Sequence, residues 1–257
     1  MAFDFILTEK KEDIGIITLN RPAKLNAMNH YMMAEIHTAL SDFENDEEVR
    51  VLIMTGAGEK AFCAGADIHE EAEISKEKTI AREDMRQWSR FDNTWHVANF
   101  KKPTICALNG LAYGGGGYLS AAFDIRIGCD RSAFRFVSVK VGMVSGTWTL
   151  PQVIGFSMTK ELLFSGRVVP ADEAYRIGLL NRLIPAAEVM PASLALAKEI
   201  AGNNQPAVLG LKNILNHNIG LGLTEMRDNE RETVARSVPI PNPKDSFAQF
   251  LKEHEKK

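Results

Sequence analysis

The feature that most constrains the fold is a pair of short apolar runs, each followed by small residues and glycine. Residues 51–55 end at Gly56-Ala-Gly58, and residues 104–108 lead to Asn109-Gly110 and then to Gly114-Gly-Gly-Gly117. Runs of this length without polar alternation are typical of strands buried on both faces. Parallel strands need helical crossovers between them, so the sequence predicts an α/β fold of repeated strand–helix units.

Other segments fit this reading. Asn29 is expected to cap a helix that carries Met32, Ile36, Leu40 and Phe43 on one apolar face. Residues 3–8 and 14–19 predict a hairpin with a turn over residues 10–15. A strand is expected at 125–129, helices are expected at 91–100 and 118–123, and the polar segment 70–90 is interpreted as a covering helix or loop.

Strand signals almost vanish after about residue 155. Helices are expected at 157–164, 170–177, 186–201, 207–217, 223–236 and 245–255. We therefore expect a strand-and-helix core over residues 1–190 and a helical region over residues 191–257. Because such a tail cannot easily bury a core alone, it should pack on the first part or on another subunit, and we interpret it as an oligomerisation region.

Composition excludes several classes of protein. The formal net charge of -3 gives no basic field for nucleic acid. No apolar run approaches the roughly 18 residues of a membrane span, and the N-terminus lacks a leader pattern, so a cytoplasmic location is expected. Cys63, Cys106 and Cys129 show no Cys-x-x-Cys spacing and predict buried free thiols, while the histidines show no metal-ligand spacing.

Two segments can bring backbone N–H groups close to a ligand. The glycines at 114–117 follow a buried strand and open a helix, whose first N–H groups lack internal partners and suit a phosphate or an oxyanion. A tight strand–helix junction explains the run equally well. Residues 61–68, Ala-Phe-Cys-Ala-Gly-Ala-Asp-Ile, form a second turn of small residues, where Asp67 is a better helix cap than a catalytic group.

Several motifs in one order make the chain resemble the crotonase superfamily, the enoyl-CoA hydratase and isomerase family. They are Leu19-Asn-Arg-Pro22, Asn26-Ala-Met28, Phe62-Cys-Ala-Gly-Ala-Asp-Ile68, Lys102-Pro-Thr-Ile-Cys-Ala-Leu-Asn-Gly110, Gly114-Gly-Gly116, Phe123-Asp-Ile125 and Ser165-Gly-Arg167. The resemblance implies a spiral of ββα repeats, a homotrimer or homohexamer, and an acyl-CoA substrate with no separate cofactor.

The resemblance also implies residue roles. The N–H groups of Ala66 and Gly115 would form an oxyanion hole that stabilises a thioester enolate. Coenzyme A would lie along Ala64, Ala66, Asp67 and Ile68. Lys24 would approach a coenzyme A phosphate or remain a solvated loop residue, and the pair Phe250 and Lys252 would close the pocket, in the same or a neighbouring subunit.

The chain departs from the hydratase pattern at two positions. Tyr118 stands where related hydratases carry a glutamate after the glycine triplet, and Ser138 stands where they carry the second glutamate. Hydration needs a base for water and an acid for the α-carbon, and a phenol and an alcohol are poor substitutes. Tyr118 is the better substitute, as a proton donor or substrate-orienting group, although it also suits packing at the helix start.

Three neighbouring features carry weaker hypotheses. The loop at 144–149 is about three residues shorter than in the family, and Trp148 faces either the acyl end of the pocket or the core. His96 has a catalytic interpretation that its register does not favour. The pair His69 and Glu70 is interpreted as a solvated face.

Three functions remain open. The first is a hydratase or isomerase acting on an acyl-CoA with non-standard acid and base groups. The second is an acyl-CoA decarboxylase, C–C lyase or hydrolase, since decarboxylation produces an enolate without a base. The third is a catalytically silent acyl-CoA-binding protein.

Overall fold

The computed structural model describes residues 3–68 and 91–238, and the chain divides into two compact units, Met1–Gly202 and Asn203–Lys257. The boundary lies later than the one expected after residue 190, because the helix at 189–201 packs on the sheet of the first unit. The expectation that the C-terminal region mediates oligomerisation stays a prediction.

The first unit is built on a six-stranded sheet with the order β1-β2-β3-β5-β7-β10. Its strands are β1 (Ile6–Lys11), β2 (Ile14–Leu19), β3 (Val51–Gly56), β5 (Thr104–Leu108), β7 (Ile125–Gly128) and β10 (Arg182–Leu183). β1 pairs antiparallel with β2, and every other pairing in this sheet is parallel.

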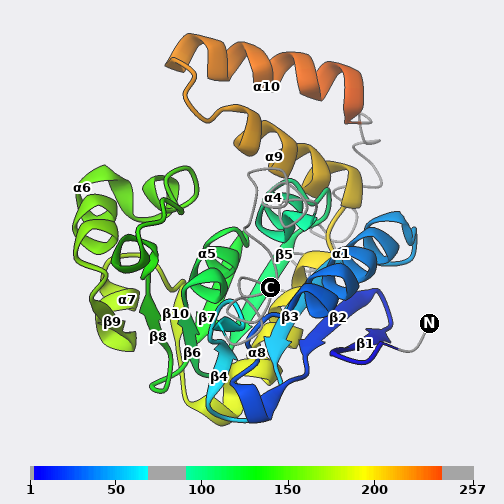
Figure 1. Cartoon of the computed structure of the whole chain (residues 1–257). Coiled ribbons are helices and arrows are strands. Elements are labelled where there is room, and N and C mark those ends of the chain that lie inside the picture. The colour runs from blue at the N-terminus through cyan, green and yellow to red at the C-terminus, as the bar shows by residue number, and fades with distance from the viewer. Residues whose placement is uncertain (1–2, 69–90, 239–257) are drawn as a thin grey trace, which may run out of the picture. The chain divides into compact units, whose positions relative to one another are not determined.

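A second sheet has the order β4-β6-β8-β9. It contains β4 (Ala61–Cys63), β6 (Leu111–Tyr113), β8 (Ala133–Arg135) and β9 (Val168–Pro170). β3, β5 and β7 each contribute to the first sheet and are followed in the chain by β4, β6 and β8, which contribute to the second (Figure 1). This alternation makes the α/β fold a series of ββ units with helices between them.

The two faces of the six-stranded sheet bury different clusters, as the period of two along each strand requires. In β3, Leu52 and Met54 belong to the larger core with α1 (His30–Asn45) and α5 (Gly115–Ala121). Val51 and Ile53 face the opposite side, where the helix α8 (Val189–Ala201) covers the sheet after the short η4 (Ala186–Glu188). Burial on both faces explains why the strand reads as one apolar run.

Helix termini follow the sequence closely. The Asn29 side chain accepts a hydrogen bond of 2.8 Å from the Met32 N–H and so caps α1, as predicted. The glycine run begins α5 at Gly115, three residues before the expected start. α4 (Asn93–Ala98) is shorter than the expected helix 91–100 and packs against α1 and α5.

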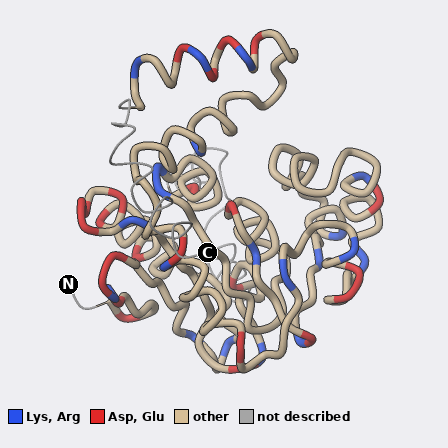
Figure 2. The backbone as a smooth tube through the Cα atoms, turned by 180° about the vertical axis from the view of Figure 1, so that it is seen from behind, with Lys and Arg blue, Asp and Glu red and all other residues tan. Residues whose placement is uncertain are grey.

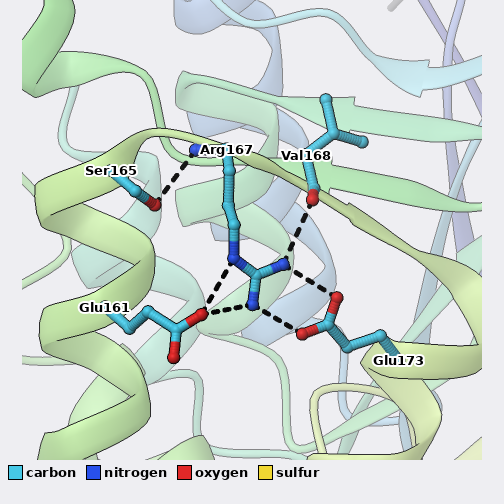
Figure 3. A network of polar contacts seen from close by, with 5 residues as sticks. All are labelled: Glu161, Ser165, Arg167, Val168 and Glu173. Atoms are coloured by element: carbon cyan, nitrogen blue, oxygen red, sulfur yellow. Dashed lines mark hydrogen bonds and ion pairs between the residues drawn. The ribbon is translucent and has the colours of Figure 1, made fainter.

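An ion-pair network fixes the corner formed by α6 (Leu150–Ser165), β9 and α7 (Ala171–Arg176). The Arg167 guanidinium donates to both oxygens of Glu173, at 2.8 and 2.6 Å, and to one oxygen of Glu161 at 2.9 and 2.6 Å (Figure 3). These hydrogen bonds lower the pKa of Glu173 and raise that of Arg167. The network is partly exposed and belongs to the scaffold.

The second unit contains α9 (Gln205–His217), capped by Asn204, and α10 (Leu223–Ser237), in which no described side chain is buried. Figure 2 shows both signs of charge along α10 and interspersed over the first unit. None of the helices in the described ranges has the length and apolar character needed to cross a bilayer.

Several expectations were wrong in detail. β1 runs to Lys11, so the hairpin turn is tighter than the expected segment 10–15, with Glu12 at φ 55°. Gly155, with φ 72° and ψ 163°, divides α6 into two helical segments, of which the second contains the expected helix 157–164 and the first was not predicted. Five short strands, β4, β6, β8, β9 and β10, were not predicted. The expected segments 70–90 and 245–255 lie essentially outside the described residues.

Candidate functional site

The segment at Ala66 is held by a single parallel bridge to Met28. The Met28 N–H donates to the Gly65 carbonyl at 2.7 Å, and the Asp67 N–H donates to the Met28 carbonyl at 2.9 Å. In a parallel bridge the central residue directs its own N–H to the other side. No described residue accepts a hydrogen bond from the Ala66 N–H, and Ala66 is exposed.

Gly115 supplies a second N–H of this kind. It is the first residue of α5, so its N–H has no acceptor within the helix, and no other described residue accepts from it. A Cβ built on Gly115 would lie 3.7 Å from the Ala66 nitrogen, so the two backbone segments that carry these N–H groups are adjacent. Gly114, with φ 48° and ψ -123°, makes the turn that brings the chain into the helix.

Close packing between the two segments requires glycine at two positions. Gly65 has φ 101°, and a Cβ there would lie 3.1 Å from the Gly115 nitrogen and 2.8 Å from the Tyr113 carbonyl oxygen. A Cβ on Gly116 would collide with the Cys63 carbonyl. The small residues of both motifs are therefore explained by close packing of backbone against backbone, and the Ala66 and Gly115 N–H groups in these adjacent segments have no acceptor within the described part of the chain.

Tyr118 and Ser138, the two positions expected to depart from the hydratase pattern, meet in space. The Tyr118 hydroxyl donates to the Ser138 Oγ at 2.9 Å, and both residues are buried. Tyr118 lies on α5, one turn after Gly115, and Ser138 begins the 3-10 helix η3 (Ser138–Val141) after β8. The Tyr118 ring also packs on Phe136, with ring centroids 5.4 Å apart. Both interpretations of Tyr118, packing and proton donation, are compatible with this position.

The shortened loop covers the tyrosine. A Cβ on Gly146, which has φ 77°, would lie 2.5 Å from Cε1 of Tyr118. Trp148 is 40% exposed and meets Trp95 of α4 edge-on, with centroids 5.6 Å apart. Trp148 therefore lies at the surface against α4 and is not part of the buried core.

His96 belongs to a cluster between α1 and α4. Its Nδ1 lies 3.3 Å from Nδ1 of His37, and its Nε2 lies 3.9 Å from a carboxylate oxygen of Glu44. Burial lowers the pKa of His96, the proximity of His37 lowers it further, and Glu44 opposes the shift. Apart from Phe100, whose ring centroid lies 6.2 Å away, the side-chain partners of His96 are on α1, and no contact links His96 to Tyr118 or Ser138 among the described residues.

The residues expected to line coenzyme A differ in their exposure and in their hydrogen bonds. The Ala64 N–H donates to the Leu25 carbonyl at 3.0 Å, Ile68 is 69% exposed, and Lys24 is exposed in η1 (Pro22–Lys24). Asp67 is buried, and its carboxylate binds Arg21 at 2.9 Å. A helix cap by Asp67 would involve residues beyond Ile68, which lie outside the described residues, as do Phe250, Lys252, His69 and Glu70.

The three cysteines are free and buried, as predicted. Burial raises the pKa of Cys63 to about 12, which keeps it a neutral thiol next to the Gly65 segment. No group of three His, Cys, Asp or Glu side chains within residues 3–68 and 91–238 is arranged to hold a metal ion.

The sequence did not reveal the contribution of Arg21. It was noted only as part of a motif, yet its guanidinium reaches Asp67, 46 positions away in the chain, next to Ala66. The sequence shows only an arginine within a loop motif, and this does not reveal which residue the guanidinium contacts.

Comparison with known proteins agrees with this architecture. The family model for enoyl-CoA hydratase/isomerase matches residues 9–256. A short-chain-enoyl-CoA hydratase of Clostridium acetobutylicum is 33% identical over 98% of this chain and 97% of its own length. A crotonyl-CoA hydratase of Syntrophomonas wolfei is 32% identical with the same coverage of both chains.

Solved structures show the same relationship. An enoyl-CoA hydratase from Bacillus anthracis superimposes with a TM-score of 0.89 at 28% identity over 97% of each chain. One from Geobacillus kaustophilus gives a TM-score of 0.87 at 31% identity over 98% of this chain and 96% of that one. The expected crotonase-like fold is thereby confirmed, and the chain belongs to the enoyl-CoA hydratase/isomerase family of acyl-CoA-processing enzymes.

Proposed function

We propose that this enzyme binds an acyl-CoA thioester with its carbonyl oxygen between the N–H groups of Ala66 and Gly115. The observation that carries the proposal is the adjacency of two backbone donors that no described residue uses. Donors that are fixed in advance stabilise the negative charge of an enolate oxygen without reorganising during the reaction. Because Gly115 is the first residue of α5, the positive end of the aligned peptide dipoles further stabilises a negative charge there.

Non-standard acid and base groups follow from the side chains near these donors. Tyr118 and Ser138 form one neutral hydrogen-bonded pair, and Tyr118 is on the helix that Gly115 begins. With Ser138 as acceptor, the phenol is held in one orientation and can donate to a substrate atom if the hydroxyl rotates. A neutral pair does not supply the carboxylate base that activates water, so we propose that fast hydration is not the reaction.

The neutral pair favours a second candidate within the same site. Decarboxylation of a malonyl-type acyl-CoA breaks the bond between the α-carbon and the carboxylate. CO2 leaves, and the electron pair stays on the α-carbon, where the thioester carbonyl delocalises it as an enolate; a C–C lyase leaves the same enolate when the departing fragment leaves as a carbonyl compound. The two N–H groups stabilise that enolate, Tyr118 gives its phenol proton to the α-carbon, and the phenolate takes a proton from water, so no carboxylate is needed.

The remaining roles are proposals of the same kind. Lys24 is exposed and can meet a coenzyme A phosphate, and Ala64 and Ile68 flank the donor segment where pantetheine would lie. Assembly into a homotrimer or homohexamer is consistent with exposed apolar side chains in the described part of the first unit. These include Val139, Val141, Met143, Val144, Phe156 and Phe164.

A mass-spectrometric screen of acyl-CoA thioesters tests the function. The panel contains enoyl-CoA, 3-hydroxyacyl-CoA and malonyl-type thioesters, and each reaction is repeated with Gly115→Pro. We expect turnover of at least one thioester by the wild type and its loss in the variant. Binding of coenzyme A esters without turnover would instead establish a catalytically silent binding protein.

A further inference from the structure

Arg21 organises the loop that carries the Ala66 donor. Its backbone N–H donates to the Asn26 side chain at 3.0 Å, and its carbonyl accepts from the N–H groups of Lys24 and Asn26. The guanidinium donates through Nη1 to the Ala27 carbonyl and through Nη2 to Asp67 at 2.9 Å, and it lies over the Phe5 ring at 5.7 Å. One side chain therefore joins the loop to the residue after Ala66.

The backbone contacts on either side of this ion pair support the same segment. Leu25 accepts from the Ala64 N–H, and Met28 makes the bridge on both sides of Ala66. Leu25 and Asn26 have φ values of 52° and 55°, in the left-handed region that costs a non-glycine residue energy. Such a loop needs side-chain contacts to hold its shape, and Arg21 and the buried Asn26 provide them.

The ion pair between Arg21 and Asp67 is shielded from water. The Asp67 side chain is 9% exposed and that of Arg21 is 16% exposed, so solvent screens the pair poorly. Asp67 directly follows Ala66 in the chain. The pair therefore anchors the residue next to the Ala66 peptide, and a fixed residue there limits how far the Ala66 N–H can turn.

We infer that Arg21 is a positioning residue for the reaction: through Asp67 and the Ala27 carbonyl it fixes the direction of the Ala66 N–H. The inference rests on the proposed function. It predicts that removing Arg21 lowers kcat more than it raises KM, because the interaction that is lost strengthens as the enolate forms.

The test compares Arg21→Gln, Asp67→Asn and the double variant with the wild type, using a thioester that the wild type turns over. Arg21→Gln should lower kcat by about tenfold to a hundredfold, since it loosens the donor segment. Asp67→Asn should lower it less, because Arg21 keeps its contact with the Ala27 carbonyl. The double variant should lose no more kcat than Arg21→Gln, because both substitutions break the same tether.

Two further variants separate positioning from stability. Arg21→Lys keeps the charge but cannot serve both Asp67 and Ala27, so its kcat should fall between the wild type and Arg21→Gln. Arg167→Gln removes an arginine–carboxylate pair of the scaffold and is the matched control, with kcat per folded molecule unchanged. If Arg21→Gln does not fold, Arg21→Lys and Asp67→Asn provide the test: a lower kcat in both supports the role of Arg21, and an unchanged kcat in both contradicts it.

A spectroscopic reading distinguishes this inference from the proposed function. The infrared stretch of a carbon-13 thioester carbonyl should shift to lower frequency on binding to the wild type, and less on binding to Arg21→Gln. No shift with the wild type would overturn the proposed function. A wild-type shift that Arg21→Gln and Arg21→Lys retain in full, with unchanged kcat, would overturn the role of Arg21 alone.

Discussion

The two backbone donors and the two side chains beyond them differ in what determines them. Ala66 and Gly115 present main-chain groups whose positions follow from glycines packed against backbone, at Gly65 and Gly116. Tyr118 and Ser138 present side chains in a buried hydrogen bond, and each could be exchanged without moving the main chain. If the donors bind the thioester oxygen as proposed, a change of these two side chains can alter the reaction while the donors stay in place.

The largest expected effect concerns hydration. With Tyr118 and Ser138 in place of a carboxylate pair, crotonyl-CoA hydration should be slower than that of an efficient hydratase by about 10² to 10⁴, the range that a positioned acid or base contributes. The measurement follows loss of the enoyl thioester absorbance, with the Clostridium acetobutylicum enzyme as the reference assayed in parallel. Comparable kcat/KM values for the two enzymes would contradict the claim that Tyr118 and Ser138 prevent fast hydration.

The next effect concerns the donors themselves. Gly115→Pro deletes the N–H at the first helical position, where proline is tolerated, and should lower kcat by about 10² to 10³. Gly115→Ala is the control, because it keeps the N–H and its added methyl would first meet the movable Met28 Cε at 3.0 Å. Equal losses of kcat in both variants would mean that the added bulk, and not the missing N–H, causes the effect.

A smaller effect is expected within the side-chain pair. Tyr118→Phe removes the phenol proton and keeps the ring on Phe136, so kcat should fall about a hundredfold, the lower end of the range for acid catalysis. Ser138→Ala removes only the acceptor and should cost less in kcat. Steady-state kinetics on the thioester identified in the screen decide between them. If Tyr118→Phe is fully active, Tyr118 is a packing residue.

The scaffold network should affect stability and not chemistry. Arg167→Gln leaves Glu173 and Glu161 without their guanidinium, and the free energy of unfolding should fall by about 1 kcal/mol, a modest value because the pair is partly exposed. Urea denaturation provides the measurement. A loss of kcat per folded molecule would show that this corner reaches the site after all.

The smallest effect is a pH dependence of stability at His96. Its pKa is lowered in the folded protein, chiefly by burial, with His37 adding to the shift and Glu44 opposing it. As pH falls below about 6.5 the unfolded chain takes up the proton first, so unfolding becomes easier. Urea midpoints at pH 7.5 and 5.5 should differ less for His96→Asn than for the wild type.

The exposed His217 provides the matched control for that experiment. Replacing His217 with asparagine should leave the pH dependence of the urea midpoint unchanged. If the difference between the two urea midpoints falls equally in both variants, His96 is not the group responsible for the pH dependence.

The elements that could be predicted from the sequence are those with a local sequence pattern. The runs at Val51–Gly56 and Thr104–Leu108 and the Asn29 cap were predicted because burial on both faces and a capping side chain are local patterns. Strands of three residues such as Ala61–Cys63 were missed because they are too short to show a period. The Arg21–Asp67 pair was missed because nothing local identifies a partner 46 residues away.

The positions of Ala66, Gly115, Tyr118 and Ser138 came from resemblance to a family, and the structure adds how each pair is arranged. Adjacency of the first two depends on Gly65 fitting against Tyr113 and Gly115, a contact between segments about fifty residues apart. The hydrogen bond between the second two depends on β8 placing Ser138 opposite α5. Neither arrangement follows from composition or spacing.

The central claim is that the N–H groups of Ala66 and Gly115 polarise a bound thioester. Its most direct test is the infrared carbonyl frequency of a carbon-13-labelled acyl-CoA bound to the wild type, to Gly115→Ala and to Gly115→Pro. We predict a shift to lower frequency in the first two and a largely lost shift in Gly115→Pro, with the ligand still bound. An equal shift in all three proteins, or none in the wild type, would contradict it.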